Sequence, residues 1–284
     1  MDTANTTDPA AIEQLLTHVV REGEHLYRDV PWRKNREPYA IVVSEFMLQQ
    51  TQVARVLHYY KPWLQRFPSF DALAAADTAE VLAEWQGLGY NRRALSLKRL
   101  AQLVSEQYAG RLPDCYDTLL TLPGIGPATA AAILAFAYNR YSPVPYLETN
   151  VRSVILHEVF PDSDQVDDKA ISAVLAAATQ QAQQQGITAQ QWSYALLDYG
   201  TWLKKAFPNP SRRSKHHSQQ SRFEGSFRQK RAAVLRALLA EPDQSVADLA
   251  DTTGLTPAES EEVLAALCQE GFVQACGQWY RIAQ

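Results

Sequence analysis

Apolar side chains recur every three or four residues through most of the chain, which is the spacing of helices that bury one face. From Tyr39 to Arg66 the pattern predicts one helical segment, with Pro38 before its start and an interruption at Pro62. Shorter helices follow, separated by turns that contain Pro or Gly. They are predicted over residues 70–76, 78–85, 92–109, 115–121, 127–138, 149–159, 167–185 and 189–204. The sequence therefore predicts a compact all-α domain of many short helices.

The pattern changes after residue 207. Between Pro208 and Gly225 the apolar periodicity disappears, and Pro, Ser, Asn and basic residues dominate. Three amphipathic stretches come next, and two short apolar runs flank Cys276-Gly277. Three helices followed by a hairpin are the element order of a winged-helix domain. We expect three parts: a helical domain 1–207, a basic linker or loop 208–226, and a small winged-helix-like domain 227–284.

The distribution of charge leaves two interpretations open. The net charge of −4 disfavours a strongly basic nucleic-acid-binding footprint. However, the charged residues between 212 and 231 are all basic apart from Glu224, and the C-terminal part is rich in Asp and Glu. A basic segment followed by an acidic module can present a phosphate-binding face at a near-neutral total, or it can be a solvated linker.

The polar N-terminal sequence, the short apolar runs and the spacing of the cysteines predict a cytoplasmic protein without a membrane partner. The start, Met1 to Pro9, is polar, and no apolar run approaches the length of a membrane span. Cys115, Cys268 and Cys276 lie far apart, which predicts neither a disulfide framework nor a metal-ligand cluster.

The strongest local motif is Leu122-Pro123-Gly124-Ile125-Gly126-Pro127. Two glycines one residue apart allow a tight turn and a close approach to another surface, and Pro127 suits the first turn of a helix. The amides at that helix start suit an anion such as phosphate. By itself the motif also fits an ordinary turn between two helices.

This hairpin resembles that of the helix-hairpin-helix DNA glycosylases. The string from Ser44 to Val53 is similar to the active-site helix of the MutY adenine glycosylases, and Arg28–Lys34, Gly87–Tyr90 and Leu147–Val151 match further motifs in order. The resemblance spans Tyr27 to Lys204. It implies the helix-hairpin-helix glycosylase fold and a nucleoid-associated base-excision-repair enzyme that acts on double-stranded DNA.

The favoured substrate is adenine opposite guanine or 8-oxoguanine. Mismatched thymine or uracil is the runner-up, and a non-catalytic lesion-binding protein or a winged-helix regulator is the alternative of another class. A counterpart of the Nudix-like domain that reads 8-oxoguanine is not evident, so we expect weak discrimination between the two opposite bases.

Two carboxylates carry the predicted chemistry. Glu45 matches the family's general acid, and its apolar neighbours favour the raised pKa that a proton donor needs. Glu148 stands where the family usually has aspartate, the group that stabilises the sugar cation. The extra methylene of glutamate is the main departure from the motif, since a displacement of about 1 Å can cost about 100-fold in rate.

The resemblance also assigns binding residues. Those that match the extruded-base pocket and the residues inserted into the base stack are Arg28, Trp32, Arg33, Gln49, Gln50, Tyr90 and Asn150. Those of the hairpin that match contacts to the DNA backbone, often with a bound monovalent cation, are Leu122, Gly124, Gly126 and Thr129.

Two absences refine the expected chemistry. Ala128 occupies the hairpin position where lyases carry a Schiff-base lysine, so we expect a monofunctional enzyme. The four cysteines of the MutY iron–sulfur cluster would fall on Lys204, Ser211, Ser214 and Gln220, so we expect no cluster and no other metal or cofactor.

The C-terminal module is expected to contact protein rather than DNA. Its last predicted helix, 256–270, carries four glutamates, which a polyanion repels in the groove. We expect a monomer, with a possible protein contact through this module.

Overall fold

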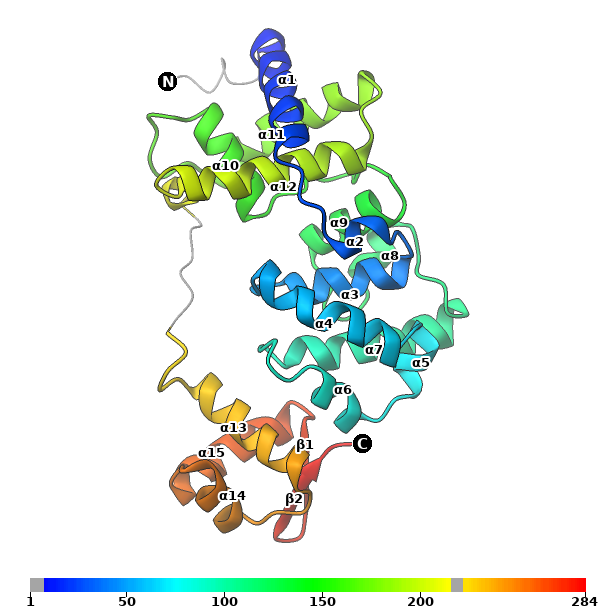
Figure 1. The fold of residues 1–284 in the computed structure, drawn as a ribbon, viewed down its shortest axis with the longest axis vertical. Helices are drawn as coiled ribbons and strands as arrows, with labels where there is room; N and C mark the ends of the chain where they lie inside the picture. The colour runs from blue at the N-terminus through cyan, green and yellow to red at the C-terminus, as the bar shows by residue number, and fades with distance from the viewer. Residues whose placement is uncertain (1–7, 216–221) are drawn as a thin grey trace. The chain divides into compact units, whose positions relative to one another are not determined.

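The computed structural model describes residues 8–215 and 222–284 (Figure 1). The chain forms two compact units, each built from two separated stretches. Unit 1 comprises Met1–Glu45 and Pro113–Gln219, and unit 2 comprises Phe46–Leu112 and Gln220–Gln284. The predicted all-α class is confirmed, and the one sheet among the described residues is a two-stranded hairpin.

Unit 1 is helical throughout. Its elements are α1 (Pro9–His25), α2 (Pro31–Lys34), most of α3 (Pro38–Leu48), α8 (Tyr116–Leu120), α9 (Pro127–Ala137), α10 (Thr149–Glu158), α11 (Asp168–Gln184), α12 (Ala189–Ala206) and the 3-10 turn η2 (Pro210–Arg213).

Helix α1 completes the core of unit 1, although the sequence analysis predicted no helix before Tyr39. It begins at Pro9 after Asp8, whose side chain accepts a hydrogen bond from the amide of Ala11. Its buried positions Ile12, Leu15, Leu16 and Val19 form one apolar stripe. This stripe belongs to the same core cluster as residues of α10, α11 and α12.

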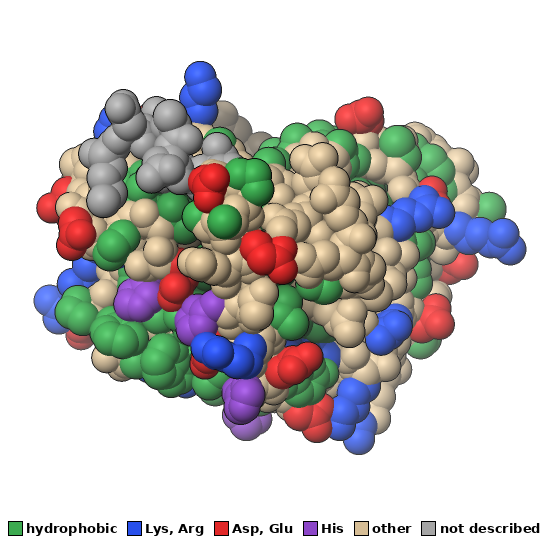
Figure 2. Space-filling model, turned by 90° about the horizontal axis from the view of Figure 1, so that it is seen from above, with side chains coloured by type: hydrophobic (Ala, Val, Ile, Leu, Met, Phe, Trp, Pro, Cys, Tyr) green, Lys and Arg blue, Asp and Glu red, His purple; other side chains and the backbone are tan. Residues whose placement is uncertain are grey.

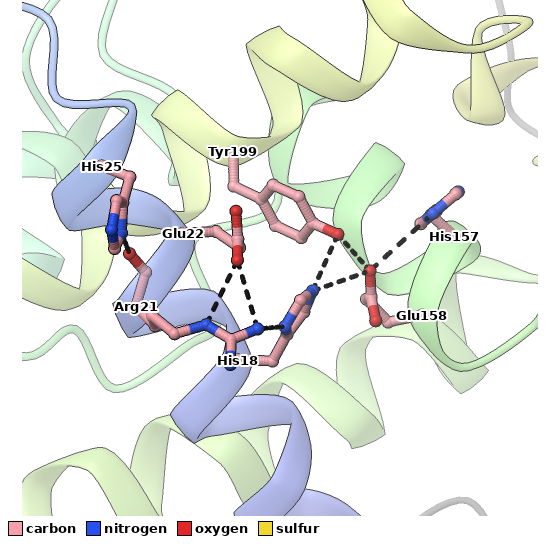
Figure 3. Close-up of polar contacts among 7 residues, drawn as sticks. All are labelled: His18, Arg21, Glu22, His25, His157, Glu158 and Tyr199. Atoms are coloured by element: carbon pink, nitrogen blue, oxygen red, sulfur yellow. Dashed lines mark hydrogen bonds and ion pairs between the residues drawn. The ribbon is translucent and has the colours of Figure 1, made fainter.

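A polar network also joins α1 to α10 and α12 (Figure 3). His18 Nε2 lies 3.1 Å from the hydroxyl of Tyr199 and 3.7 Å from Glu158 Oε1. The same hydroxyl donates to Glu158, and His157 lies 3.9 Å from that carboxylate. The three helices are therefore fixed by polar pairs at the edge of their apolar core.

Unit 2 contains the end of α3 and the remaining elements. They are α4 (Val53–Arg66), α5 (Phe70–Ala75), α6 (Thr78–Glu84), α7 (Arg92–Tyr108), α13 (Phe227–Ala240), α14 (Val246–Thr253), α15 (Pro257–Gln269), β1 (Val273–Cys276) and β2 (Trp279–Ile282).

The single helical segment predicted from Tyr39 to Arg66 is wrong in detail. The structure has two helices, α3 and α4, which are separated after Leu48 by a turn in which Gln50 has a φ of 54°. The predicted interruption at Pro62 is absent, and α4 continues through it. Hydrophobic periodicity did not reveal the break, because the turn is fixed by Arg93, which is distant in sequence and donates a hydrogen bond to the carbonyl of Gln49.

The C-terminal module has the predicted order of three helices and a hairpin. Strands β1 and β2 are antiparallel, with Val273 opposite Ile282 and Cys276 opposite Trp279, so the turn falls at residues 277–278, one residue later than predicted. Glu270 binds both Arg92 of α7, at 2.6 and 2.7 Å, and Arg231 of α13, at 2.6 and 2.7 Å. This glutamate is therefore a packing element that joins the module to α7.

The segment after α12 is fixed in unit 1 by Arg213. Its guanidinium donates to the carbonyls of Leu156 at 2.7 Å and Pro161 at 2.6 Å, and also to that of Phe160. These groups lie at and just beyond the C-terminal end of α10, where a cation satisfies orphan carbonyls and complements the helix dipole. The residues before 216 thus form an ordered loop rather than a flexible linker, and residues 216–221 lie outside the described chain.

Charge and hydropathy add two observations. On the face seen in Figure 2, basic and acidic side chains are interspersed rather than gathered by sign. Within the described residues, no helix is both long and apolar enough to cross a membrane.

The Arg213 contacts generate a stability prediction. Arg213→Ala should lower the free energy of unfolding by about 2–3 kcal/mol, because several carbonyls at the end of α10, most of them part-buried, lose a charged donor. Arg212→Ala is the matched control, since Arg212 is the exposed neighbour in the same turn, and it should change stability by less than about 0.5 kcal/mol. Urea unfolding followed by circular dichroism measures both, and equal effects would contradict the anchoring role.

Candidate active site

Glu45 lies in the last turns of α3, between side chains that are completely buried. Phe46 and Met47 have no exposed surface, and Ser44 is buried and donates to the carbonyl of Ile41 at 2.8 Å. Glu45 itself is half-buried. Burial, and secondarily the negative charge of Glu148, raise the pKa of Glu45 to about 8. Glu45 is therefore protonated at neutral pH and can donate a proton.

Glu148 is held at the start of α10 by that helix's own backbone. It is the N-cap residue, and its Oε1 accepts a hydrogen bond from the amide of Asn150 at 2.8 Å. Burial raises its pKa, while hydrogen bonds from Asn150 and Val151 and the positive charge of Lys204 oppose that rise. The longer side chain of glutamate thus directs its carboxylate back to the helix amides, which favour the ionised form.

The two carboxyl groups share one environment in unit 1. The charge of Glu148 acts on Glu45, and both act on Tyr146, whose pKa is raised chiefly by burial. Burial likewise raises the pKa of Tyr194, and Glu45 adds to this rise. The structure thus brings together the two predicted catalytic residues and adds two neutral phenols beside them.

Asn150 presents an unsatisfied polar atom at this place. The backbone carbonyl of Asn150 packs directly against Gly200 of α12. A Cβ atom at position 200 would lie only 2.1 Å from this oxygen, so only glycine fits there. The side-chain Oδ1 of Asn150 is buried and has no hydrogen-bond partner among the described residues. Such an atom is costly unless a ligand or water pairs with it, which is typical of a binding position.

Lys204 is a residue that the sequence analysis associated only with the missing cluster. It lies one helical turn after Gly200, on the face of α12 that packs against the start of α10. Burial lowers the pKa of Lys204, and the charge of Glu148 opposes this effect. Its ammonium is therefore an electrostatic partner for Glu148.

The basic residues predicted for the base pocket converge on Asp198. Arg33 is buried and binds this carboxylate with two parallel hydrogen bonds of 2.6 and 2.7 Å, and its guanidinium lies 4.0 Å from the ring centroid of Tyr194. Arg28 donates to Asp198 at 2.5 Å but keeps a side-chain exposure of 31%. Trp32 is buried, at 6% exposed. Arg33 thus holds Asp198, whereas Arg28 retains accessible surface.

The predicted inserting residues lie in unit 2 and depend on Arg93. Its guanidinium donates to the carbonyls of Gln49, Leu88 and Gly89 at 2.6 to 3.1 Å, as well as to those of Phe46 and Met47 at the end of α3. These bonds join the two turns that carry Gln49, Gln50 and Tyr90. Gln50 and Tyr90 both have positive φ, at 54° and 49°, a strained conformation that such bonds maintain.

The predicted hairpin lies between α8 and α9. Leu122 and Ile125 are buried anchors, while Gly124 and Gly126 are exposed. Gly124 has a φ of 79°, and a side chain at Gly126 would point into open space, so the turn leaves room for a close approach. Thr129 lies in the first turn of α9, and the buried side chain of Leu122 restricts this residue to backbone contacts.

The positions that match cluster cysteines do not suit an iron–sulfur centre. Ser211 and Ser214 are buried, and their hydroxyls donate to Asn209 at 2.9 Å and Asp168 at 3.4 Å. Neither side chain can supply a thiolate. Lys204 is a cation under the electrostatic influence of Glu148, and Gln220 lies outside the described residues. The described part of the chain has no group of three His, Cys, Asp or Glu residues arranged to hold a metal.

A cavity of about 430 Å³ lies elsewhere, in unit 2, between α7 and the end of α15. Arg92, Arg99 and Glu270 contribute to its lining, and none of the predicted site residues does. The geometry of buried ionisable groups, rather than the volume of this cavity, therefore defines the candidate site.

Comparisons with known proteins agree with this geometry. Residues 43–180 match the HhH-GPD superfamily base excision DNA repair protein family. The chain is 34% identical over 278 residues to the adenine DNA glycosylase of Mycolicibacterium smegmatis, with 88% of this chain and 89% of that protein covered. It is 42% identical over 137 residues to the human adenine DNA glycosylase, with 45% of this chain and 25% of the human protein covered.

Solved structures show the same fold. A thermostable thymine-DNA glycosylase superposes with a TM-score of 0.57 at 24% identity, covering 70% of this chain and 88% of the other. A trapped endonuclease III–DNA covalent intermediate superposes with a TM-score of 0.53 at 16% identity, covering 76% and 91%. The fold, the matched motifs and the extent of sequence identity together show that the chain belongs to the HhH-GPD superfamily of base excision DNA repair proteins, with the adenine DNA glycosylases as its relatives.

Proposed function

We propose that this chain excises adenine opposite guanine or 8-oxoguanine by hydrolysis, with Glu45 as the general acid and Glu148 as the stabiliser of the sugar cation. Family membership makes it a DNA glycosylase, and adenine is the base named in relatives that it matches, one of them over 88% of this chain. The observation that carries the assignment of roles is the pair of perturbed carboxyls, one with a pKa of about 8 and one held by helix amides.

The proposed reaction divides the work between these carboxyls. Glu45 donates its proton to the departing adenine, which allows the bond between the base and the sugar to break without expelling an anion. The ionised Glu148 stabilises the positive charge that develops on the sugar. Water then adds to the sugar carbon, and its proton returns to a carboxylate or to solvent. The products are free adenine and an abasic site.

The binding assignments rest on the family resemblance and on accessibility. Arg28 is partly accessible and Asn150 has an unsatisfied polar atom, so both can bind the extruded nucleotide, whereas Trp32 and Arg33 are buried. In unit 2, Gln49, Gln50 and Tyr90 are proposed to enter the base stack and offset the cost of extrusion.

The hairpin is proposed to grip the DNA backbone through the amides around Gly124 and Gly126 and the start of α9, with a monovalent cation at the turn. We also propose a monomer that works without an iron–sulfur cluster. Arg213 and the two buried serines give the loop after α12 an alternative anchor.

The role of Glu45 is tested by substitution and by pH. Glu45→Gln should lower the single-turnover rate of adenine release by about 100- to 10,000-fold while DNA affinity stays near wild type, because only the transferable proton is lost. The wild-type rate should fall as pH rises above about 8, since Glu45 then ionises. Glu24→Gln, an exposed glutamate of α1, is the control. A fully active Glu45→Gln variant would exclude the mechanism.

Lys204 should control the acidic limb of the same pH profile. The positive charge of Lys204 lowers the pKa of Glu148 and so opposes the effect of burial. Lys204→Met removes this charge, so the pKa of Glu148 should rise. As the pH falls, the variant should therefore lose activity at a higher pH than the wild type does. Lys205→Met removes a charge from the exposed neighbour and should leave the limb in place. Single-turnover rates between pH 5 and pH 9 separate the two, and an unchanged limb in Lys204→Met contradicts the pairing.

The product should be an intact abasic site. Ala128 offers no amine, so strand cleavage should appear only after alkali, and borohydride should trap no covalent enzyme–DNA adduct. If an adduct forms, its loss in Lys204→Met would identify the responsible amine and overturn the monofunctional assignment.

A further inference from the structure

The cavity of about 430 Å³ in unit 2 lies between α7 and the end of α15. Its polar lining consists of Arg92, Ser96 and Arg99 from α7 and of Gln269 and Glu270 from the end of α15. All of these side chains except Glu270 carry N–H or O–H groups that donate hydrogen bonds. The lining therefore suits a ligand that is rich in hydrogen-bond acceptors.

Glu270 cannot serve as that acceptor, because two arginines already occupy it. Arg92 donates to its two carboxylate oxygens at 2.6 and 2.7 Å, and so does Arg231 of α13. The hydrogen bond from Arg92 contributes most to lowering the pKa of Glu270 to about 2, so this carboxylate is ionised at neutral pH. Two positive charges thus share one negative charge, and each carboxylate oxygen accepts two hydrogen bonds.

Arg99 adds a further guanidinium to the cavity. This residue is exposed, and no hydrogen bond or ion pair with another described residue involves its side chain. It lies against Gly271, where φ is 78° and where a Cβ atom would be 3.2 Å from Nη2 of Arg99. Glycine therefore lets the guanidinium approach the backbone beside the cavity. Ser96 lies one turn earlier on the same face of α7.

Positive charge is in excess at this place. The guanidinium groups of Arg92, Arg99 and Arg231 stand against the single carboxylate of Glu270. The carbonyls of residues 266–268, in the last turn of α15, already accept hydrogen bonds from the amides of residues 270–272. They are therefore poor ligands for a cation, and the cavity favours an anion.

We propose that this cavity binds a phosphate group, with Arg99 as its charged ligand and Ser96 and Gln269 as neutral donors. The planar fork of a guanidinium matches two phosphate oxygens, so two parallel charge-assisted hydrogen bonds can form. The volume falls within the range of about 300–1,000 Å³ that is usual for small-ligand sites, so a phosphate joined to a sugar can enter. The DNA backbone and free phosphorylated molecules share this chemistry. Neither source depends on the proposed adenine chemistry.

Inorganic phosphate is the probe for the site itself. Replacing chloride by phosphate at constant ionic strength should raise the Tm of the full-length chain, because a ligand of the folded state stabilises it. Arg99→Gln should weaken the phosphate affinity derived from this shift by about 10-fold, since a charged donor is lost. The matched control is Arg236→Gln, because Arg236 is an exposed residue of α13 that does not line the cavity, and it should retain the wild-type shift. A general salt effect of phosphate would act equally on all three proteins.

The salt dependence of binding to an undamaged duplex identifies the source of the phosphate. If the DNA backbone supplies it, Arg99→Gln should reduce the slope of log K against log salt by about 0.9, while Arg236→Gln keeps the wild-type slope. An unchanged slope, together with a phosphate shift that Arg99→Gln loses, assigns the site to a free phosphorylated molecule. If Arg99→Gln changes neither measurement, or if Arg236→Gln has the same effects, the proposal is overturned. Neither measurement requires excision, so the result stands even if the proposed adenine chemistry fails.

Discussion

The structure of unit 1 depends on the carboxylate of Asp198, which is buried on α12 and bound by Arg33 and Arg28. A buried carboxylate is tolerated only when it is fully paired, and removal of one partner from such a pair typically costs about 3–5 kcal/mol. The pair therefore fixes the segment around α2 against α12. The same helix carries Gly200, which admits the start of α10, and Lys204, which faces Glu148. Asp198 and its two arginines thus set the frame in which the two carboxyls proposed for catalysis are placed.

In each unit, one arginine side chain also binds the carbonyls at the end of a helix and so fixes the turn that follows. Arg213 takes carbonyls at the end of α10, and Arg93 takes those at the end of α3. In each case five rigid donors on one side chain satisfy several carbonyls that would otherwise be orphaned. Burial lowers the pKa of Arg93 to about 10, which leaves it fully charged at neutral pH.

Glu45 and Glu148 differ in how far neighbouring groups offset the effect of burial on their pKa values. Glu45 and Glu148 are both surrounded by protein, which disfavours their ionised forms, but only Glu148 receives helix amides and a nearby ammonium. This difference favours a proton on Glu45 and opposes one on Glu148, as the proposed donor and cation stabiliser require. The side chain of Glu148 reaches back to cap its own helix, which supports the proposal that a glutamate can take the place of the family aspartate here.

Sequence by itself determined the helical class, the order of elements in the C-terminal module and the family. Periodicity reports which faces are buried, and motifs such as Ser44–Val53 report chemistry that depends on local spacing. Only the tertiary structure revealed the break between α3 and α4, the contact of Tyr90 with Arg228, and the partners of Asp198, Lys204 and Arg93. Each of these depends on partners far apart in the chain, such as Arg93 with Phe46 or Tyr90 with Arg228. A buried charge gives no periodic signal, because its position is set by the partner that neutralises or solvates it and not by its neighbours in sequence.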